Sequence, residues 1–381
     1  MRSIRRSALL ALPLAAIVLA GCTPAEAEDT TDYDAMTHDE LVAAAEAEGA
    51  VTVYAFTSRI ATVEEEFEAA YPGIDVTAID ISSTEMVTRL TSEHEAGSAT
   101  ADVAYVSDAP VVIPELVDTG ILTSYVPERL EDVLAEEHQS PLLAQRLSTK
   151  VLMYNEEAHP GGSPVTNLWE LTQDEWTGRV IMVDPNVRGD YLDLATEMSL
   201  RADEMADAYA DLTGEELVLD DGVADAGQQF LADLYANDVV LVDDTDAVNA
   251  AIGATGQAEP PVGFTSYSDR RDNEEEGWAL QVASGVEPAN GIVFPALLGL
   301  TEGGDNPAAA RLLIDFIMGD DTETGGPAFA PFYVAGDYPV RTDMVAPEDA
   351  LGLDELGAWS IDPTETVELR DDTADFLLTI Q

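Results

Sequence analysis

The sequence contains very little cysteine, lysine or histidine, and each scarcity excludes a class of site. Cys22 is the only cysteine in 381 residues, so neither an intramolecular disulfide nor a cage of cysteine ligands around a metal can form. Lys150 is the only lysine among 16 basic residues, and the four histidines are not spaced as metal ligands are. Motifs of zinc proteases, serine hydrolases and phosphate-binding glycine loops do not occur. We therefore expect no cofactor, no metal site and no enzyme activity.

Positive charge is scarce as well. The chain carries 75 acidic side chains against 16 basic ones, which gives a formal net charge of −59 and an isoelectric point of about 4.1. This field repels phosphate backbones, so nucleic acid is excluded as a partner. Self-repulsion also destabilises a compact state in dilute buffer, whereas at about 1 M salt the Debye length is only roughly 3 Å. The composition therefore predicts a halophilic, acidic protein.

The first residues have the features of an export signal. Three arginines precede an apolar run over residues 8–20, which is too short to remain as a membrane-spanning helix. The run ends in the letters LAGC, which resemble the lipobox of bacterial and archaeal lipoproteins and imply cleavage before Cys22 and lipid attachment to its thiol. We predict a signal peptide over residues 1–21 and a lipidated tether over 22–36, holding the protein at the outer face of the membrane. An ordinary signal peptide is the alternative, and the general and twin-arginine export routes both stay open.

Beyond residue 36 the sequence alternates between strand and helix patterns. Thr37 and Glu40 form a capping box that opens a helix ending near Glu48. Strands are predicted over residues 51–56, 74–79, 103–106, 151–155, 179–183, 239–242 and 262–264. Helices are predicted over residues 61–71, from 82 onward, 224–236 and 308–318, with an apolar stretch beginning at 290. This alternation predicts an α/β fold with mostly parallel sheets covered by helices.

Hydroxyl-bearing turns follow three strands of the first block. In open α/β sheets, ligands bind beyond the carboxyl ends of the strands, and free amides at helix N-termini favour an anion. Two loops of the second block supply a facing set that includes arginine, which can clamp an anion with two hydrogen bonds. The predicted binding residues are Thr57, Ser58, Arg59, Ser82, Ser83, Thr84, Ser107, Asp108, Arg188, Gly189, Tyr267 and Ser268. The alternative is that the hydroxyls only cap helices and the arginines form surface ion pairs.

The order of several segments resembles a known family. The segments are VTVYAFTSR, ISSTEM, ADVAYVSDA, VLMYNEEAHPGGSPVTNLWELTQDEWTGRVIMVDP, NPAAARLLIDFIM and YPVRTDM, between Ala50 and Met344. They resemble the extracellular solute-binding proteins of ABC importers, in the branch of ferric-ion, phosphonate and sugar-phosphate binders. The resemblance implies a type II periplasmic-binding-protein fold whose two lobes close on a ligand about a hinge. It implies a first lobe over residues 37–150 with a return segment over 290–345, a second lobe over 151–289, and a C-terminal helical segment over 346–381.

The resemblance also implies the partners: a small solute, and the permease and ATPase subunits of an ABC importer, served by a monomer. We expect a small polar, anionic solute. Ferric ion or a ferric chelate is the first alternative, although ferric-binding members typically present two adjacent tyrosines and residues 264–268 contain only Tyr267, the metal ligand in that case. An extracellular enzyme on the same scaffold is the second alternative. A purely structural envelope protein is disfavoured by the hydroxyl-rich turns.

Overall fold

Two hydrophobic cores organise the computed structural model, which describes residues 31–381. The predicted signal peptide and the lipidation site at Cys22 lie outside the described residues. The first core draws its buried side chains from residues 41–144 and 296–340, and the second from residues 151–294 and 338–377. Both cores belong to one compact unit, Tyr33–Gln381. None of the helices in residues 31–381 combines the length and the apolar character needed to cross a bilayer.

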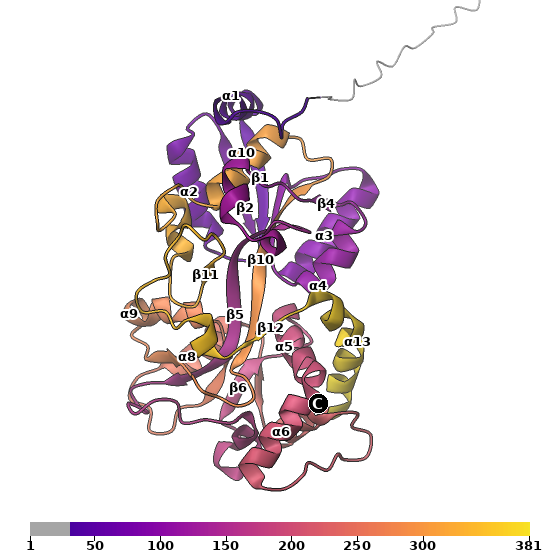
Figure 1. Cartoon of the computed structure of the whole chain (residues 1–381), viewed down its shortest axis with the longest axis vertical. Coiled ribbons are helices and arrows are strands. Elements are labelled where there is room, and N and C mark those ends of the chain that lie inside the picture. The colour runs from indigo at the N-terminus through magenta and orange to yellow at the C-terminus, as the bar shows by residue number, and fades with distance from the viewer. Residues whose placement is uncertain (1–30) are drawn as a thin grey trace, which may run out of the picture. The chain divides into compact units, whose positions relative to one another are not determined.

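Local capping chemistry sets the first elements of the chain, several of which are labelled in Figure 1. Thr37 and Glu40 form the predicted capping box, and Gly49 ends that helix at φ 76°, a left-handed conformation that glycine adopts without strain. Ser82 caps the third helix by accepting a hydrogen bond from the amide of Glu85. Up to the long fifth strand, the elements are α1 (His38–Glu48), β1 (Ala50–Ala55), α2 (Ile60–Ala70), β2 (Asp75–Asp80), α3 (Ser83–Ala96), β3 (Val103–Val106), α4 (Ala109–Val112), β4 (Leu122–Thr123) and β5 (Leu143–Asn155).

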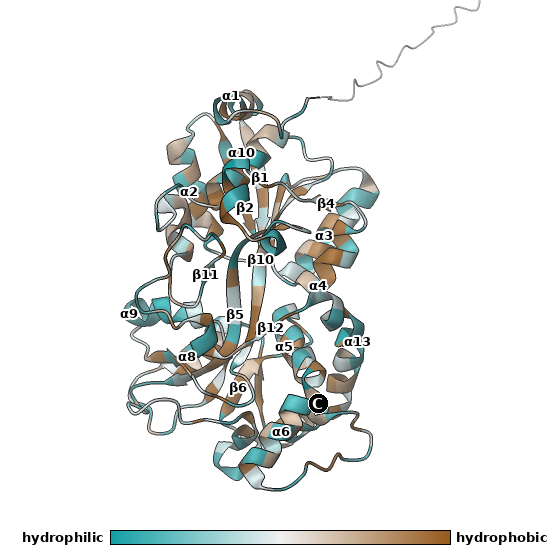
Figure 2. Ribbon diagram, in the orientation of Figure 1, coloured by the Kyte–Doolittle hydropathy of each residue, from teal (hydrophilic) through white to brown (hydrophobic). Residues whose placement is uncertain are grey.

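The second block also alternates strands and helices. Its strands are β6 (Val180–Val183), β7 (Val240–Val242), β8 (Val262–Thr265) and β9 (Leu280–Val282). Its helices are α5 (Gly189–Leu200), α6 (Ala202–Thr213), α7 (Ala226–Ala236), α8 (Thr245–Gly253) and α9 (Asn273–Glu276). The chain then continues through β10 (Gly291–Thr301), α10 (Pro307–Ile317), α11 (Gly326–Phe329), β11 (Tyr338–Pro339), α12 (Leu353–Leu356), β12 (Trp359–Ser360) and α13 (Pro363–Ile380). In Figure 2 the apolar colours concentrate on the inner strands and the polar colours on the outer helices.

The strands form one sheet in the order β2-β1-β3-β10-β5-β8-β6-β7. The three strands at each end are parallel to one another, namely β2-β1-β3 and β8-β6-β7. Between them, β10 and β5 run antiparallel to their neighbours. The prediction of an α/β fold with mostly parallel sheets flanked by helices is confirmed.

Strands β5 and β10 pass from one core to the other along their length. Leu143 of β5 is buried in the first core and Val151 in the second, while the antiparallel β10 makes the same passage in reverse. The predicted strand over 151–155 is therefore only the second half of β5. Its first half was missed because the segment 143–150, LAQRLSTK, contains five polar side chains that are nevertheless buried.

The C-terminal helix α13 packs against α5 and α7 of the second block and against α4 of the first (Figure 1). It therefore touches elements that contribute to both cores. The helices α5, α6 and α8 were not predicted individually.

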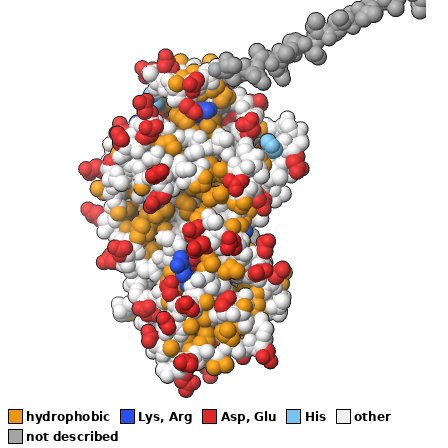
Figure 3. Space-filling model, turned by 45° about the vertical axis from the view of Figure 1, so that its right-hand side comes forward, with side chains coloured by type: hydrophobic (Ala, Val, Ile, Leu, Met, Phe, Trp, Pro, Cys, Tyr) orange, Lys and Arg blue, Asp and Glu red, His pale blue; other side chains and the backbone are white. Residues whose placement is uncertain are grey.

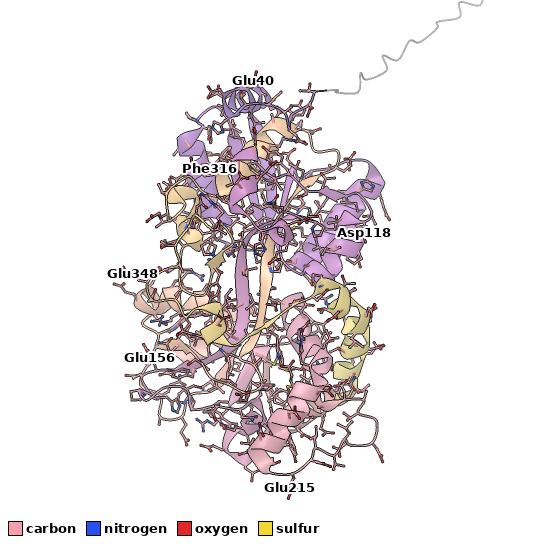
Figure 4. All side chains as sticks on the ribbon, viewed as in Figure 1. Glu40, Asp118, Glu156, Glu215, Phe316 and Glu348 are labelled. Carbon is pink, nitrogen blue, oxygen red and sulfur yellow. The ribbon has the colours of Figure 1, made fainter. Side chains whose placement is uncertain are left out.

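Acidic side chains cover the surface. On the face shown in Figure 3, aspartate and glutamate are scattered throughout, and basic side chains appear in only a few places. The labelled acids in Figure 4, Glu40, Asp118, Glu156, Glu215 and Glu348, all lie at the periphery of the ribbon. Five of the basic side chains in residues 31–381 line one cavity.

Candidate functional site

A cavity of about 460 Å³ lies between the two cores, lined by residues from both. Eleven of the twelve predicted binding residues line it: Thr57, Ser58, Arg59, Ser82, Ser83, Thr84, Ser107, Asp108, Arg188, Gly189 and Ser268. A larger hollow of about 620 Å³ on the first core, next to Phe316 (labelled in Figure 4), contains none of them. The interpretation of the strand-end turns as one cluster therefore agrees with where the structure places them.

Tyr267 is the exception. Its side chain is only 1% exposed and does not line the cavity. Its hydroxyl donates to the carbonyl of Asp349 at 3.2 Å and accepts from the amide of Leu351 at 3.3 Å, so the ring is fixed in the second core and points away from a ligand. The sequence pattern showed a tyrosine beside a predicted strand end, but not that the segment around residue 350 would cover it.

The first charged cluster consists of Arg59 and Arg146, which line the cavity, and Asp337, which is fully buried and does not line it; we call this cluster the first triad. Arg59 Nη1 lies 2.5 Å from Asp337 Oδ2, and Arg146 Nε lies 3.1 Å from Asp337 Oδ1. Both guanidiniums also stack on the ring of Phe332, at 5.0 and 4.6 Å from its centroid. Arg146 also contacts the hydroxyl of Tyr105.

The charges of the first triad follow from its burial. Burial alone raises the pKa of Asp337, but attraction to Arg146 and Arg59 outweighs it and holds that pKa below its usual value. Burial lowers the pKa of Arg146 to about 10, so this side chain remains charged near neutral pH. Two cations and one anion leave the first triad with one surplus positive charge.

The second cluster consists of Lys150, Arg188 and Asp190, which we call the second triad. Lys150 Nζ and Arg188 Nη2 lie 3.1 and 3.2 Å from the same atom, Asp190 Oδ2. Lys150 also donates to Ser266 Oγ at 2.7 Å, and Arg188 donates to Thr245 Oγ1 at 2.9 Å. Burial alone raises the pKa of Asp190, but the two cations outweigh it and keep that pKa low, so this triad too has one surplus positive charge.

Asp108 and Gly189 meet where the two blocks approach each other. Asp108 has a left-handed backbone at φ 69°, and its carboxylate accepts a hydrogen bond from Arg370 of α13 at 2.9 Å. A Cβ atom at Gly189 would lie 2.0 Å from Asp108 Oδ2, so only glycine fits this approach. Arg370 also donates to Asp193 of α5 at 2.8 Å, which ties three elements together.

The hydroxyl groups of the turns have mixed roles. Ser83 Oγ and Ser107 Oγ share a hydrogen bond of 3.0 Å across the β3 end and the α3 start. Ser82 caps α3, as the capping alternative predicts, while Ser268 Oγ is buried and has no hydrogen-bond partner among the described residues. The helices α2, α3, α5 and α8 all begin at the cavity wall, where their N-terminal dipoles favour an anion.

Sequence reasoning missed the residues on β5 that line the cavity. Arg146, Ser148 and Lys150 alternate along the strand, so their side chains share one face. The scarcity of lysine was the available signal, since the one lysine of the chain lies at this position. Asp337 gave no such signal because it lies 278 residues from its partner Arg59. Among residues 31–381, the structure holds no group of three or more His, Cys, Asp or Glu side chains that could bind a metal ion.

Comparison with known proteins was made on sequence and on structure. Residues 50–324 match the family described as bacterial extracellular solute-binding protein. No curated protein matches the chain. The match covers more than half of the chain and includes both sides of the cavity.

Solved structures similar to this one have the same fold. Iron-bound HitA from Pseudomonas aeruginosa is 18% identical, with a TM-score of 0.66 over 87% of this chain and 99% of that one. Apo ferric ion-binding protein A from Pasteurella haemolytica is 16% identical, with a TM-score of 0.65 over 87% and 98% of the two chains. AfuA from Actinobacillus pleuropneumoniae, with fructose-6-phosphate bound, is 18% identical, with a TM-score of 0.62 over 87% and 97%. At these identities the similarity establishes the fold and leaves the ligand open.

Proposed function

The chain belongs to the bacterial extracellular solute-binding proteins, and on that premise we propose that its cavity binds a small organic anion for delivery to an ABC permease. Membership confirms the predicted family, the extracytoplasmic location and a binding function instead of an enzymatic one. A solute and the permease of an ABC importer are therefore its partners. The nature of the solute is the part that we propose.

The observation that carries this proposal is the pair of triads at the cavity, each of which has two cations and one anion. Five basic side chains, including the only lysine, line the cavity together with seven aspartates, in a chain that has 16 basic residues against 75 acidic ones. Each triad keeps its aspartate ionised and has one surplus positive charge. Fixed, buried cations of this kind bind carboxylate or phosphate groups with charge-assisted hydrogen bonds.

Ferric ion is the weaker alternative. Two of the similar structures are named as ferric-ion or iron-binding proteins, and the third holds fructose-6-phosphate, an organic anion. In this chain the one tyrosine expected to bind iron, Tyr267, is turned away from the cavity and bonded to backbone. Within each triad the surplus positive charge would also repel a trivalent metal ion, whereas it attracts an organic anion.

Binding would proceed by capture and closure. Arg146 and Lys150 lie on the strand shared by both cores, whereas Arg59 and Arg188 come from the first and the second block respectively. In this structure Arg59 already lies beside Arg146 and Arg188 beside Lys150, so an anion held in one triad gains contacts from the opposite block when the two blocks approach. Only ligand contacts that are stronger in the closed form can shift the protein toward it.

We further propose that the protein works as a monomer anchored by a lipid on Cys22. The support is the LAGC sequence and the placement of the only cysteine, both outside the described residues. Membrane fractionation of wild type and Cys22→Ala tests this anchor. Wild type should pellet with membranes and Cys22→Ala should not, and a protein that stays soluble in both cases would contradict lipidation.

Thermal shift in about 2 M potassium chloride tests the proposed ligand class. Carboxylates, inorganic phosphate, sugar phosphates and ferric citrate are added singly, and mass spectrometry identifies any molecule that co-purifies from native membranes. We expect one or more organic anions to raise the melting temperature and Arg59→Ala to reduce that rise while the unliganded protein remains folded. Tyr267→Phe is the matched control and should bind as wild type. Visible absorption on ferric addition, with no response to any organic anion, would refute the proposal.

A further inference from the structure

The basic residues on β5 form a row of fixed length. Arg146, Ser148 and Lys150 alternate on one strand face, line the cavity and are almost fully buried. Between Arg146 and Lys150 the pairing with β10 is regular, from Ala296 to Ile292. Four residues of extended strand place the two Cα atoms roughly 13 Å apart. This separation belongs to the backbone, so movement of the two blocks does not change it.

The surplus positive charges of the two triads lie at the two ends of this row. Arg146 belongs to the first triad and Lys150 to the second, and the uncharged Ser148 lies between them. A ligand with one anionic group can neutralise only one triad. The other triad would then be enclosed with an uncompensated charge, which is unfavourable in a buried site.

Three side chains that line the cavity carry unpartnered polar atoms. Arg146 Nη2 and Asp190 Oδ1 are buried and have no hydrogen-bond partner among the described residues, and the same is true of Ser268 Oγ. Buried polar groups in native proteins normally have partners, so these atoms are suited to a ligand. Arg146 Nη2 requires an acceptor such as a carboxylate oxygen. Asp190 Oδ1 requires a donor, and a hydroxyl group of the ligand supplies one.

The rim of the cavity limits how long the ligand can be. Asp80, Asp243, Asp244 and Asp246 line the cavity and are exposed to solvent. These acids lie near Arg188, which interacts with Asp80 and donates to Thr245 beside the other three, so a carboxylate that extended beyond the second triad would meet them and be repelled. The spacing of the triads thus sets the minimum length of the favoured ligand, and the acidic rim sets its maximum length.

We infer that the ligand is a hydroxylated dianion whose two anionic groups lie at opposite ends of a short chain, one in each triad. This inference rests on the proposed function and narrows it to a substrate class. An aldarate, a sugar-derived acid with a carboxylate at each end, is the kind of molecule that meets all these requirements. Lys150 is then the residue that distinguishes a dianion from a monoanion.

A series of straight-chain dicarboxylates from four to eight carbons tests the inference by calorimetry in about 2 M potassium chloride. Each diacid is compared with the monocarboxylate of equal length, and adipate with glucarate for the effect of hydroxyl groups. We expect affinity to peak at one chain length, to exceed that of the matched monoacid at least tenfold, and to rise again on hydroxylation. Protein labelled with ¹⁵N-lysine has one labelled backbone amide, that of Lys150, and its signal should shift with the diacid of favoured length.

Variants at Lys150 separate the role of its charge from its role in packing. Lys150→Met should reduce diacid affinity to the level of the monoacid, because only the first triad then keeps its surplus positive charge. Lys150→Arg keeps the charge and extends its reach, so it should retain the preference for diacids and favour a shorter chain. Arg270→Met, outside the cavity, is the matched control and should bind as wild type. If Lys150→Met does not fold, Lys150→Arg still tests the shift in favoured length.

The outcomes distinguish the inference from the proposed function. Equal binding of monoacids and diacids at every length would overturn the dianion and leave an anion-binding protein. Tight binding of a sugar monophosphate, unaffected by Lys150→Met, would overturn it in the same way, because both charges would then lie in one triad. If no carboxylate and no phosphate binds the protein, that result would instead refute the proposed function itself.

Discussion

Arg370 joins both sides of the cavity, and its loss should destabilise the protein more than the loss of any surface arginine. On α13, its guanidinium lies 2.9 Å from Asp108 Oδ1 and 2.8 Å from Asp193 Oδ1. The three side chains are 13%, 3% and 2% exposed. In Arg370→Met, an apolar chain of similar length replaces the arginine, and two buried carboxylates face each other without a cation.

The size of the effect follows from burial. Removing one partner of a buried ion pair costs about 3–5 kcal/mol, because the other charge stays enclosed. Unfolding entropy of about 2.1 cal/mol/K per residue gives roughly 0.7 kcal/mol/K for a unit of about 350 residues. The melting temperature of Arg370→Met should therefore fall by about 4–7 °C.

The deficit should also depend on pH. Burial raises the pKa of Asp108 and that of Asp193, so folding takes up protons at these groups. Stability from a carboxyl with a raised pKa is present at low pH and is lost as pH rises through the folded-state pKa. Without Arg370 both pKa values rise further, so the deficit should be larger at pH 8 than at pH 5.

Urea and thermal unfolding of ligand-free protein, in about 2 M potassium chloride at both pH values, measure the effect. Arg270→Met is the matched control, since Arg270 pairs with Asp349 at 3.4 Å and that aspartate is 68% exposed. Such a surface pair contributes less than about 1 kcal/mol. Asp193→Asn in the Arg370→Met background should recover part of the loss by removing one enclosed charge. Equal losses in Arg370→Met and Arg270→Met, or no recovery, would refute this account of the buried cluster.

Three further predictions concern salt, sterics and acid. The melting temperature of wild type should rise between about 0.1 and 2 M potassium chloride as self-repulsion is screened, and a flat response would contradict salt adaptation. Gly189→Ala should destabilise by about 1–3 kcal/mol in urea unfolding, because its Cβ would overlap Asp108, and an unchanged midpoint would show that this approach can relax. The low pKa values of Asp337 and Asp190 contribute stability that is lost as pH falls through them, so Asp337→Asn should show a shallower loss of melting temperature below about pH 4 than wild type does.

Local chemistry explains which parts of the fold the sequence predicts well. Thr37, Gly49 and Ser82 act within one turn of their own helices, so their roles can be predicted from the adjacent residues in the sequence. The same holds for the turns around residues 57–59 and 107–108, which follow short strands of clear β-branched or apolar character. Parallel strands bring their carboxyl ends to one edge of the sheet. The turns predicted from local sequence therefore lie together, and eleven of the twelve predicted residues line one cavity.

Long-range contacts explain the rest. Arg146 and Lys150 lie in the half of a strand whose sequence is largely polar. Their burial depends on ion pairs with residues that are distant in the sequence, Asp337 and Asp190. Tyr267 follows a predicted strand directly, as a ligand-binding residue would, yet its hydroxyl donates a hydrogen bond to the carbonyl of Asp349. No periodicity or motif in the sequence predicts such contacts, because each contact depends on segments that come together only in the folded chain.

The acidic surface and the basic cavity act over different distances, and salt separates their effects. A net charge of −59 repels an anionic solute from afar, whereas the triads act through contacts of about 3 Å inside the cavity. At about 1 M salt the Debye length is also roughly 3 Å, so the distant repulsion vanishes while enclosed contacts are screened much less. Salt should therefore speed the capture of the anion, opposite to its usual effect on charge-steered association, and change its release little. In concentrated salt the negative electrostatic field of the protein is screened close to its surface. A protein of this charge can therefore bind an organic anion there, with an affinity that depends on the contacts inside the cavity.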